Sequence, residues 1–155
     1  MNPPIRWSWH TLDAFAPLDL FDYLRLRTDA FVVEQNCAYP ELDDHDRDAL
    51  HLTGHIDGRL IGALRLIGPG RVHDDPALGR VVVAPAARGT GAGHLLVAEG
   101  LRTAAELYPG RGNEIAAQAH LQGFYGRHGF VAVGEEFLED GIPHVMMRVS
   151  ADRMP

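Results

Sequence analysis

A glycine-rich segment contains the residues of this chain that are best suited to bind an anion: Arg88-Gly89-Thr90-Gly91-Ala92-Gly93-His94. It follows a β-branched run, Arg80-Val81-Val82-Val83, and a break at residues 84–87, and a helical pattern begins at Leu95. Glycines let a ligand approach the backbone closely, and a helix start offers unpaired N–H groups with a partial positive charge. This arrangement predicts a binding site for a phosphate or a pyrophosphate.

The same segment excludes two common kinds of nucleotide site. The chain has no lysine, and its 14 fixed side-chain cations are all arginines. A Walker A motif requires Gly-Lys-Ser/Thr, so P-loop NTPase chemistry is excluded. The glycines run Gly-x-Gly-x-Gly rather than Gly-x-Gly-x-x-Gly, which disfavours a dinucleotide-binding Rossmann fold.

A second motif lies further along the chain, where Phe124-Tyr125 is followed by Gly129-Phe130. Together the two motifs resemble those of the GNAT superfamily of acyl-CoA N-acyltransferases, and the resemblance covers about residues 5–149. Four further segments resemble the ElaA-like branch of that superfamily: Phe31-Val32-Val33-Glu34-Gln35, Gly79-Arg80-Val81, Ala117-Gln118-Ala119-His120-Leu121-Gln122 and Glu139-Asp140-Gly141-Ile142-Pro143-His144.

The resemblance implies that acetyl-CoA is the acyl donor. The backbone of Val81, Val82 and Val83 would hydrogen-bond the pantetheine amides, so that the pantetheine lies beside it like an added strand. The glycine loop would hold the pyrophosphate. Gln118 stands at a strand end facing the cofactor, where many members of the superfamily have Asn. The residues expected to contact the donor are Val81, Val82, Val83, Arg88, Gly89, Thr90, Gly91, Ala92, Gly93, His94 and Gln118.

Tyr125 is the expected general acid. When an amine attacks a thioester, the departing thiolate needs a proton, and a tyrosine with a reference pKa of about 10 can supply it. In similar proteins this tyrosine lies beside the CoA sulfur. The alternative is an aromatic side chain that only packs the short helix, as expected for Phe124.

The general base stays open between three alternatives. Residues 77–81 contain no carboxylate, although several relatives take their base from the strand before the glycine loop. Glu34 lies in a region that lines the acceptor site in similar proteins, and His144 can exchange a proton near neutral pH. A solvent relay without a dedicated base fits equally well.

The acidic run from Glu41 to Asp48 is expected to be a solvated loop, because it is too charged to be core; alternatively it attracts a cationic amine. Its Asp-x-Asp-x-Asp opening resembles an EF-hand, but Ala49 replaces the required glycine and His55 the required glutamate. His51 and His55 would lie roughly 13 Å apart on a strand, too far to share one zinc ion. No metal site is predicted.

The expected fold class is α/β, with a mixed, mostly antiparallel central sheet of about six to seven strands flanked by helices, in one domain over residues 1–155. Asp57-Gly58 and Asp140-Gly141 predict hairpin turns, and Asp19 is expected to cap the first helix. Strands are expected over 5–10, 50–56, 60–67, 78–83, 115–119, 131–133 and 145–149, and helices over about 19–37 and 91–108, with a short one through residues 124 and 125.

Composition restricts the partners and the location. The 155 residues carry a formal net charge of −7, which argues against nucleic-acid binding. No apolar run is long enough to cross a membrane and the N-terminal residues lack a signal peptide, so a soluble, cytoplasmic protein is expected. The single cysteine, Cys37, agrees with a reducing compartment. A homodimer is possible, because relatives often dimerise.

These features together predict a cytoplasmic N-acetyltransferase that transfers an acetyl group from acetyl-CoA directly to a primary amine on a small molecule or peptide. The alternative is a non-catalytic module that binds or senses acyl-CoA. Tyr125 separates the two, because a sensor needs no acid beside the sulfur.

Overall fold

The computed structural model of the protein describes residues 3–155. The chain forms two compact units, one of Met1–Leu66 with Arg80–Leu96 and the other of Ile67–Gly79 with Val97–Pro155. Within residues 3–155, eight strands make a mixed, mostly antiparallel sheet, so the expected fold class is confirmed with one more strand than expected. No helix of the described residues is long and apolar enough to span a membrane.

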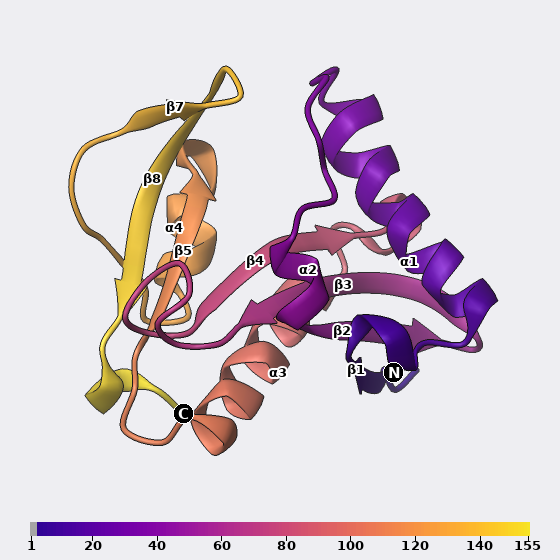
Figure 1. The fold of residues 1–155 in the computed structure, drawn as a ribbon, viewed down its shortest axis with the longest axis horizontal. Helices are drawn as coiled ribbons and strands as arrows, with labels where there is room; N and C mark the ends of the chain where they lie inside the picture. Colours follow the sequence, from indigo (N-terminus) through magenta and orange to yellow (C-terminus); the bar gives the residue numbers. More distant parts are fainter. Residues whose placement is uncertain (1–2) are drawn as a thin grey trace. The chain divides into compact units, whose positions relative to one another are not determined.

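The first unit contains strands β1 (Arg6–His10), β2 (Leu50–Ile56), β3 (Arg59–Ile67) and the end of β4 (Ala77–Val83), in that spatial order (Figure 1). β1 and β3 both pair antiparallel with β2. Positive φ angles at Asp57 (49°) and Gly58 (78°) form the tight turn between β2 and β3. The predicted hairpin is therefore confirmed, because the turn residues adopt the mirror-image geometry that matches strand twist.

Helix α1 (Pro17–Thr28) begins two residues before the expected cap at Asp19, so that part of the prediction is wrong. Ala16 is the N-cap and Pro17 opens the helix, where its fixed φ suits the first helical position and its missing N–H is not needed. A π-helix, η2 (Asp29–Glu34), continues directly from α1. The whole helical segment thus ends at Glu34, before Cys37.

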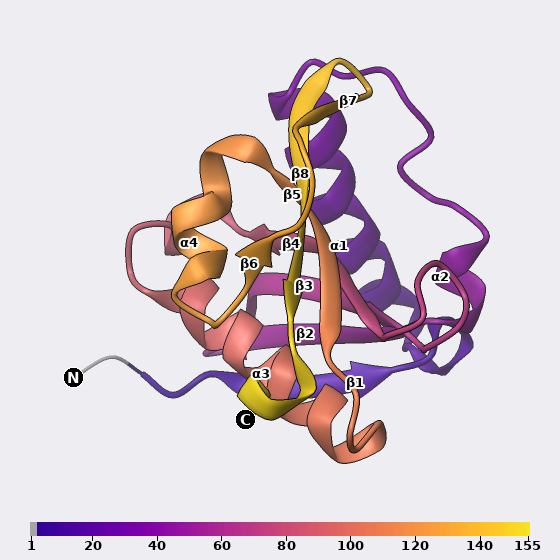
Figure 2. The same ribbon diagram turned by 90° about the vertical axis from the view of Figure 1, so that its left-hand side faces the viewer.

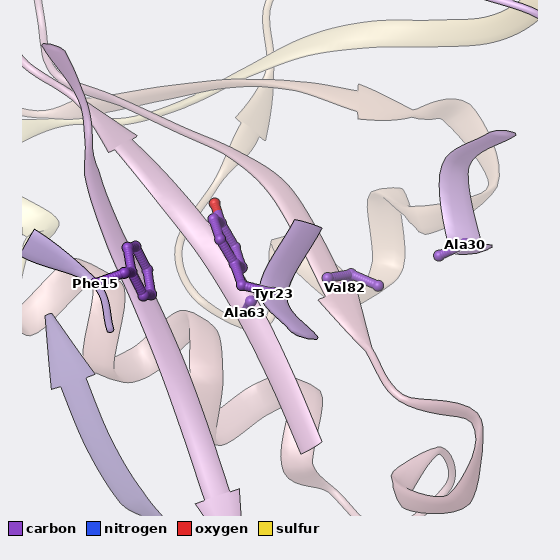
Figure 3. Close-up of a cluster of buried hydrophobic side chains, with 5 residues drawn as sticks. All are labelled: Phe15, Tyr23, Ala30, Ala63 and Val82. Carbon is purple, nitrogen blue, oxygen red and sulfur yellow. The ribbon is translucent and has the colours of Figure 1, made fainter. Parts of the chain in front are cut away.

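The core of the first unit lies between this helical segment and strands β3 and β4. Figure 3 shows the five buried side chains of one core cluster, with Tyr23 between Phe15 and Val82 in this view. The rings of Phe15 and Tyr23 stack 5.3 Å apart. The cluster consists of Phe15, Tyr23, Ala30, Ala63 and Val82.

The acidic run is not the solvated loop that its composition predicts. Residues 41–44 lead into a one-turn helix, α2 (His45–Asp48), and Glu41 and Asp46 are buried while Asp44 and Asp48 are exposed. The prediction is wrong because arginines from other elements neutralise the two buried carboxylates, as described below. Burying a paired charge costs far less than burying a lone one.

The second unit contains the start of β4 with strands β5 (Asn113–Gln118), β8 (Ile142–Val149), β6 (Val131–Ala132) and β7 (Phe137–Glu139). β8 pairs antiparallel with β5 on one side and with β6 and β7 on the other. β4 and β5 share one parallel bridge, between Ala77 and Glu114. The sequence did not predict β7, a three-residue strand without a buried side chain.

Two helices carry the motifs. α3 (Ala92–Leu107) follows the glycine loop as expected, and α4 (Gln122–Gly126) carries Phe124 and Tyr125. Figure 2 shows α4 beside β6, on one side of the β5–β8 pair. Four short 3-10 turns complete the secondary structure: η1 (Leu12–Ala14), η3 (Pro85–Ala87), η4 (Ala119–Leu121) and η5 (Ala151–Arg153).

Candidate active site

The glycine loop has the backbone conformation that its sequence predicts. Gly89 and Gly91 both have positive φ angles, of 76° and 87°, and no atom lies within 4 Å of where a Cβ would stand at either position. Alternating residues of this kind turn successive N–H groups toward a common centre and leave room for an anion. The loop leads directly into α3, whose first N–H groups have no partner within the helix.

Thr90 holds this loop against the helix start. Its hydroxyl donates to the carbonyl of Ala87 and accepts from the N–H of Ala92, at 3.4 Å. A side chain that caps one of the first helical N–H groups fixes the direction of the others. Thr90 is therefore placed to shape the loop, whether or not it contacts the ligand.

Arg88, expected at the phosphates, instead contacts protein atoms. Its two terminal nitrogens donate to the two carboxylate oxygens of Glu34 at 2.9 and 3.1 Å, and its Nε donates to the carbonyl oxygen of Val83 at 3.0 Å. This hydrogen-bonded pair lowers the pKa of Glu34. Both side chains stay exposed to solvent, by 45% and 41%. The Glu34–Arg88 pair therefore joins the end of η2 to the start of the glycine loop.

The last residues of β4 form a strand edge suited to an extended ligand. Of the described residues of β4, only Ala77 pairs with β5, so the residues after it have no strand partner on that side. Val82 is buried, whereas Val81 and Val83 are partly exposed. A free edge with N–H and C=O groups can hydrogen-bond an extended amide chain as another strand would. Together with the glycine loop, this edge fits the pantetheine and pyrophosphate of a CoA ester.

A buried cluster of charged residues connects α1, the acidic run, β3 and the end of β4 within the first unit. At its centre Arg27, which is fully buried, donates to Glu41 Oε2 at 2.7 Å and to both oxygens of Asp46 at 2.8 and 3.1 Å. Arg65 donates to both oxygens of Asp43, at 2.7 and 3.0 Å, and to Asp46 at 3.0 Å. We call this set, with Arg80, the buried charge cluster: Arg27, Glu41, Asp43, Asp46, Arg65 and Arg80.

Electrostatics in the buried charge cluster favour the ionised forms. Burial by itself would raise the pKa of Asp46, but hydrogen bonds and charge from Arg27, together with the Asp43 N–H and Arg65, hold it well below its usual range. Burial also opposes ionisation of Asp43, and Arg65 and Arg80 lower its pKa. Both carboxylates are therefore charged at neutral pH. Sequence reasoning missed this cluster, because its members come from four separate segments.

Tyr125, the expected acid, is 5% exposed on α4. Its ring makes edge contacts with Phe124 at 5.0 Å and with Phe130 at 5.9 Å. Burial raises the pKa of its hydroxyl above the usual value. The side chain therefore keeps its proton throughout the neutral pH range.

His144 lies in the hairpin of β7 and β8, directly opposite Gln118 of β5 and Phe137 of β7. Its Nδ1 is 2.7 Å from the carbonyl oxygen of Ile142, and its Nε2 is 3.5 Å from a carboxylate oxygen of Glu139. A carbonyl only accepts, so Nδ1 carries a hydrogen, and in the neutral ring Nε2 has the lone pair. The structure thus places two predicted site residues, Gln118 and His144, next to each other and adds Glu139, which sequence reasoning missed.

The other histidines form no metal centre. Among residues 3–155, no group of three or more His, Cys, Asp or Glu side chains is arranged to hold a metal ion. His51 is buried between the hydroxyl of Tyr23 and the carbonyl of Asp46, at 2.6 and 2.9 Å. Its ring nitrogens are thus both engaged with protein atoms.

Comparison with known proteins identifies the class of protein that this fold and these motifs define. The family model of the acetyltransferase (GNAT) domain matches residues 27–151. The ElaA protein of Escherichia coli is 38% identical over 130 residues, which cover 83% of this chain and 85% of ElaA. The chain therefore belongs to the GNAT family of acyl-CoA N-acyltransferases, in its ElaA-like branch.

Solved structures agree with this assignment. An acyl-CoA N-acyltransferase from Pseudomonas aeruginosa superposes with a TM-score of 0.88 at 44% identity, over 95% of this chain and 100% of that one. The crystal structure of E. coli ElaA gives 0.87 at 34% identity, with the same coverage. BjaI, a CoA-dependent acyl-homoserine lactone synthase solved with SAM and isopentyl-CoA, shares the fold at 16% identity and a TM-score of 0.75, over 97% of this chain and 86% of BjaI.

Proposed function

We propose that this protein is an N-acetyltransferase that transfers an acetyl group from acetyl-CoA directly to a primary amine. Membership of the GNAT family supports acyl transfer from a CoA ester. The observation that carries the proposal furthest is the pair of left-handed glycines with open space around them, immediately before α3 and after a strand with a free edge. The isopentyl-CoA bound in BjaI supports a CoA ester as the class of donor.

The donor would be held along its length by the end of β4 and by the glycine loop. Peptide groups of Val81, Val82 and Val83 would hydrogen-bond the pantetheine amides, and N–H groups from Gly89 to His94 would bind the pyrophosphate. Acetyl-CoA would supply the thioester carbonyl that the amine attacks. The remaining steps are proton transfers, which the side chains of this chain perform.

Arg88 would exchange partners when the donor binds. Its guanidinium is now held by Glu34 in an exposed ion pair, which contributes little and opens readily. A pyrophosphate presents more negative charge and the same bidentate geometry as a carboxylate. Arg88 would therefore move to the phosphates and leave Glu34 free at the end of η2.

Tyr125 would act as the general acid. Burial keeps its hydroxyl protonated, so it can donate to the thiolate that leaves when the acetyl group is transferred. The packing of its ring between Phe124 and Phe130 fixes the direction of the hydroxyl. A rigidly held donor loses little freedom as the reaction proceeds.

His144 would act as the general base. Its Nδ1–H is committed to Ile142, so the lone pair of Nε2 is the group that can accept the amine proton, and Glu139 would stabilise the resulting imidazolium. Glu34 is the weaker candidate while Arg88 lowers its pKa. It stays an alternative in the donor complex, where Arg88 would have moved away.

Three broader features belong to the same proposal. The family match extends through segments of both compact units, which supports one GNAT domain formed by the whole chain. The single cysteine is in keeping with a cytoplasmic location. A homodimer stays a prediction, which a native mass measurement checks.

The test combines calorimetry with release of free CoA thiol over a panel of amines, from polyamines and amino acids to peptides. We expect acetyl-CoA to bind and at least one primary amine to support turnover. Tyr125→Phe should bind acetyl-CoA as tightly as the wild type, with turnover lower by about a hundredfold because the general acid is lost.

Three results would change the conclusion. Donor binding without turnover on any amine would favour the non-catalytic acyl-CoA-binding module. Equal turnover of Tyr125→Phe and the wild type would remove Tyr125 from the mechanism, and Phe124→Leu is the control for altered packing on the same helix. Failure of the wild type to bind acetyl-CoA would contradict both functions.

A further inference from the structure

Arg80 has an unusual backbone conformation for a residue inside a strand. Its φ angle is +48°, although it lies in the middle of β4. The other non-glycine residues with positive φ in the described chain are Asn36, Asp57 and Asp140, all in turns and all of types that tolerate this region. A long side chain at positive φ inside a strand is unfavourable, so other contacts must stabilise it.

Those contacts come from the acidic run. The Nε of Arg80 donates to Glu41 Oε2 at 3.1 Å, and its Nη2 donates to the Glu41 carbonyl at 3.1 Å and to Asp43 Oδ2 at 3.4 Å. The guanidinium also lies 5.8 Å from the ring centre of Tyr39. Three hydrogen bonds and an aromatic contact therefore hold the side chain in one place.

The two acceptors of Arg80, Glu41 and Asp43, also bind two other arginines. Arg27 binds both the carboxylate and the carbonyl of Glu41, at 2.7 and 3.2 Å, and Arg65 binds both oxygens of Asp43. Arg27 is buried on α1 and Arg65 on β3, so their hydrogen bonds hold the acidic run against these two elements. The contact with Arg80 is thus a fixed anchor on β4.

The position of this anchor along β4 gives it a role in ligand binding. Arg80 stands between the bridge to β5 at Ala77 and the free edge at Val81–Val83. A left-handed residue interrupts the regular course of a strand, as in a β-bulge, and redirects the peptide groups that follow it; we call this left-handed kink at Arg80 the bulge of β4. The conformation of Arg80 therefore decides where the N–H and C=O groups of Val81–Val83 point.

We propose that Arg80, Glu41 and Asp43 are positioning residues, which hold the bulge of β4 and so orient its free edge to hydrogen-bond the pantetheine of the acyl donor. This inference rests on the proposed function, since it assigns a role to the acidic run in that same site. A preorganised edge binds an extended ligand without first having to be ordered. The acidic run then acts neither as a solvated loop nor as an attractant for amines.

The test uses two substitutions that remove the same guanidinium but differ in backbone preference. Glycine adopts positive φ freely, whereas a β-branched residue strongly disfavours it. We expect Arg80→Gly to keep the bulge and Arg80→Val to lose it. The dissociation constant of acetyl-CoA, measured by calorimetry, should be roughly tenfold or more weaker for Arg80→Val than for Arg80→Gly.

A control pair shows whether the bulge itself is present. Arg59 is an exposed arginine at the start of β3 and is absent from the residues with positive φ. We expect Arg59→Val to be more stable to urea than Arg59→Gly, and the order to reverse at Arg80. Hydrogen exchange of the Val81–Val83 amides should be faster in Arg80→Val than in Arg80→Gly, in the absence of any ligand.

The outcomes distinguish this inference from the proposed function. Equal acetyl-CoA affinity of the two Arg80 variants would overturn the positioning role while leaving the acetyltransferase proposal intact. If the wild type binds no acetyl-CoA, the proposed function fails and this inference fails with it.

Discussion

Two arginine–carboxylate arrangements in the first unit have nearly the same hydrogen-bond lengths and very different surroundings. The Glu34–Arg88 pair, at 2.9 and 3.1 Å, is more than 40% exposed on both sides. Arg27 binds Asp46 at 2.8 and 3.1 Å, and neither side chain is more than 4% exposed. Distance alone therefore does not tell how much such a pair contributes.

Burial determines how readily each of these arginine–carboxylate arrangements opens. An exposed pair competes with water and salt, so it opens at little cost and its arginine can turn to another anion. A buried pair cannot open without leaving a charge unpaired in a medium of low polarity. The same chemistry thus suits the Glu34–Arg88 pair for exchange with a ligand and the buried charge cluster for holding backbone in place.

The largest effect should follow from removing the central arginine of the cluster. Arg27→Ala leaves the buried carboxylates of Glu41 and Asp46 without their main partner, and we expect it to lower the free energy of unfolding by about 3–5 kcal/mol. Urea denaturation followed by circular dichroism measures this loss. Arg27→Met retains much of the side-chain volume, so a similar loss in this variant would assign the effect to charge rather than to packing.

The exposed pair provides the matched control. Arg88→Ala removes an arginine with the same bidentate geometry, and we expect a much smaller change in the urea midpoint. Equal losses in Arg27→Ala and Arg88→Ala would show that burial does not separate the two arrangements. That result would contradict the comparison on which the assignment of roles depends.

An intermediate effect is expected from acid. The folded protein holds the pKa of Asp46 and Asp43 below the value of about 4 that an aspartate has in the unfolded chain. Their contribution to stability is therefore complete above that value and is lost as the pH falls toward the lower folded values. We expect urea midpoints to drop steeply below pH 4 in the wild type.

Comparing the urea midpoints of the wild type and Asp46→Asn shows how much of the loss of stability in acid comes from the buried charge cluster. Asp46→Asn cannot titrate, so the gap between its urea midpoint and that of the wild type should narrow as the pH falls below 4. Burial lowers the pKa of His51 and the charge of Asp46 raises it, so the loss from His51, which begins near pH 6.5, is larger in Asp46→Asn, and the comparison for Asp46 is made below pH 4. A gap that stays constant between pH 7 and pH 3 would contradict the role of Asp46.

Local patterns predicted the parts of the fold that local physics determines. Asp57-Gly58 and Asp140-Gly141 form hairpin turns because their own φ preferences select them, and Gly89 and Gly91 shape the loop for the same reason. The buried charge cluster was not predictable in this way. Arg27 meets Glu41 and Asp46 across 14 and 19 residues, and Arg80 meets Glu41 across 39, so no single helix or strand contains both partners.

In the candidate site, too, the local motifs were predictable from sequence and the contacts between distant residues were not. The motif around Tyr125 and the glycine loop is readable from sequence, and the structure agrees with the local conformation expected for both. Partners made by the fold were missed: Glu139 beside His144 across the hairpin, and Arg88 bound to Glu34 across 54 residues. An alternating pattern assigns a residue to a face, but it does not report which distant charge shares that face.

The smallest effect should come from the exposed pair, in binding rather than in stability. Glu34→Gln removes the charge that competes for Arg88, so we expect acetyl-CoA to bind tighter by roughly threefold, with less change in high salt. Glu136→Gln removes the same charge from another exposed position and should leave affinity unchanged. Turnover of Glu34→Gln near the wild-type value would support His144 as the base, whereas a large loss would transfer that role to Glu34. Weaker donor binding by Glu34→Gln would contradict the exchange of Arg88 between carboxylate and phosphate.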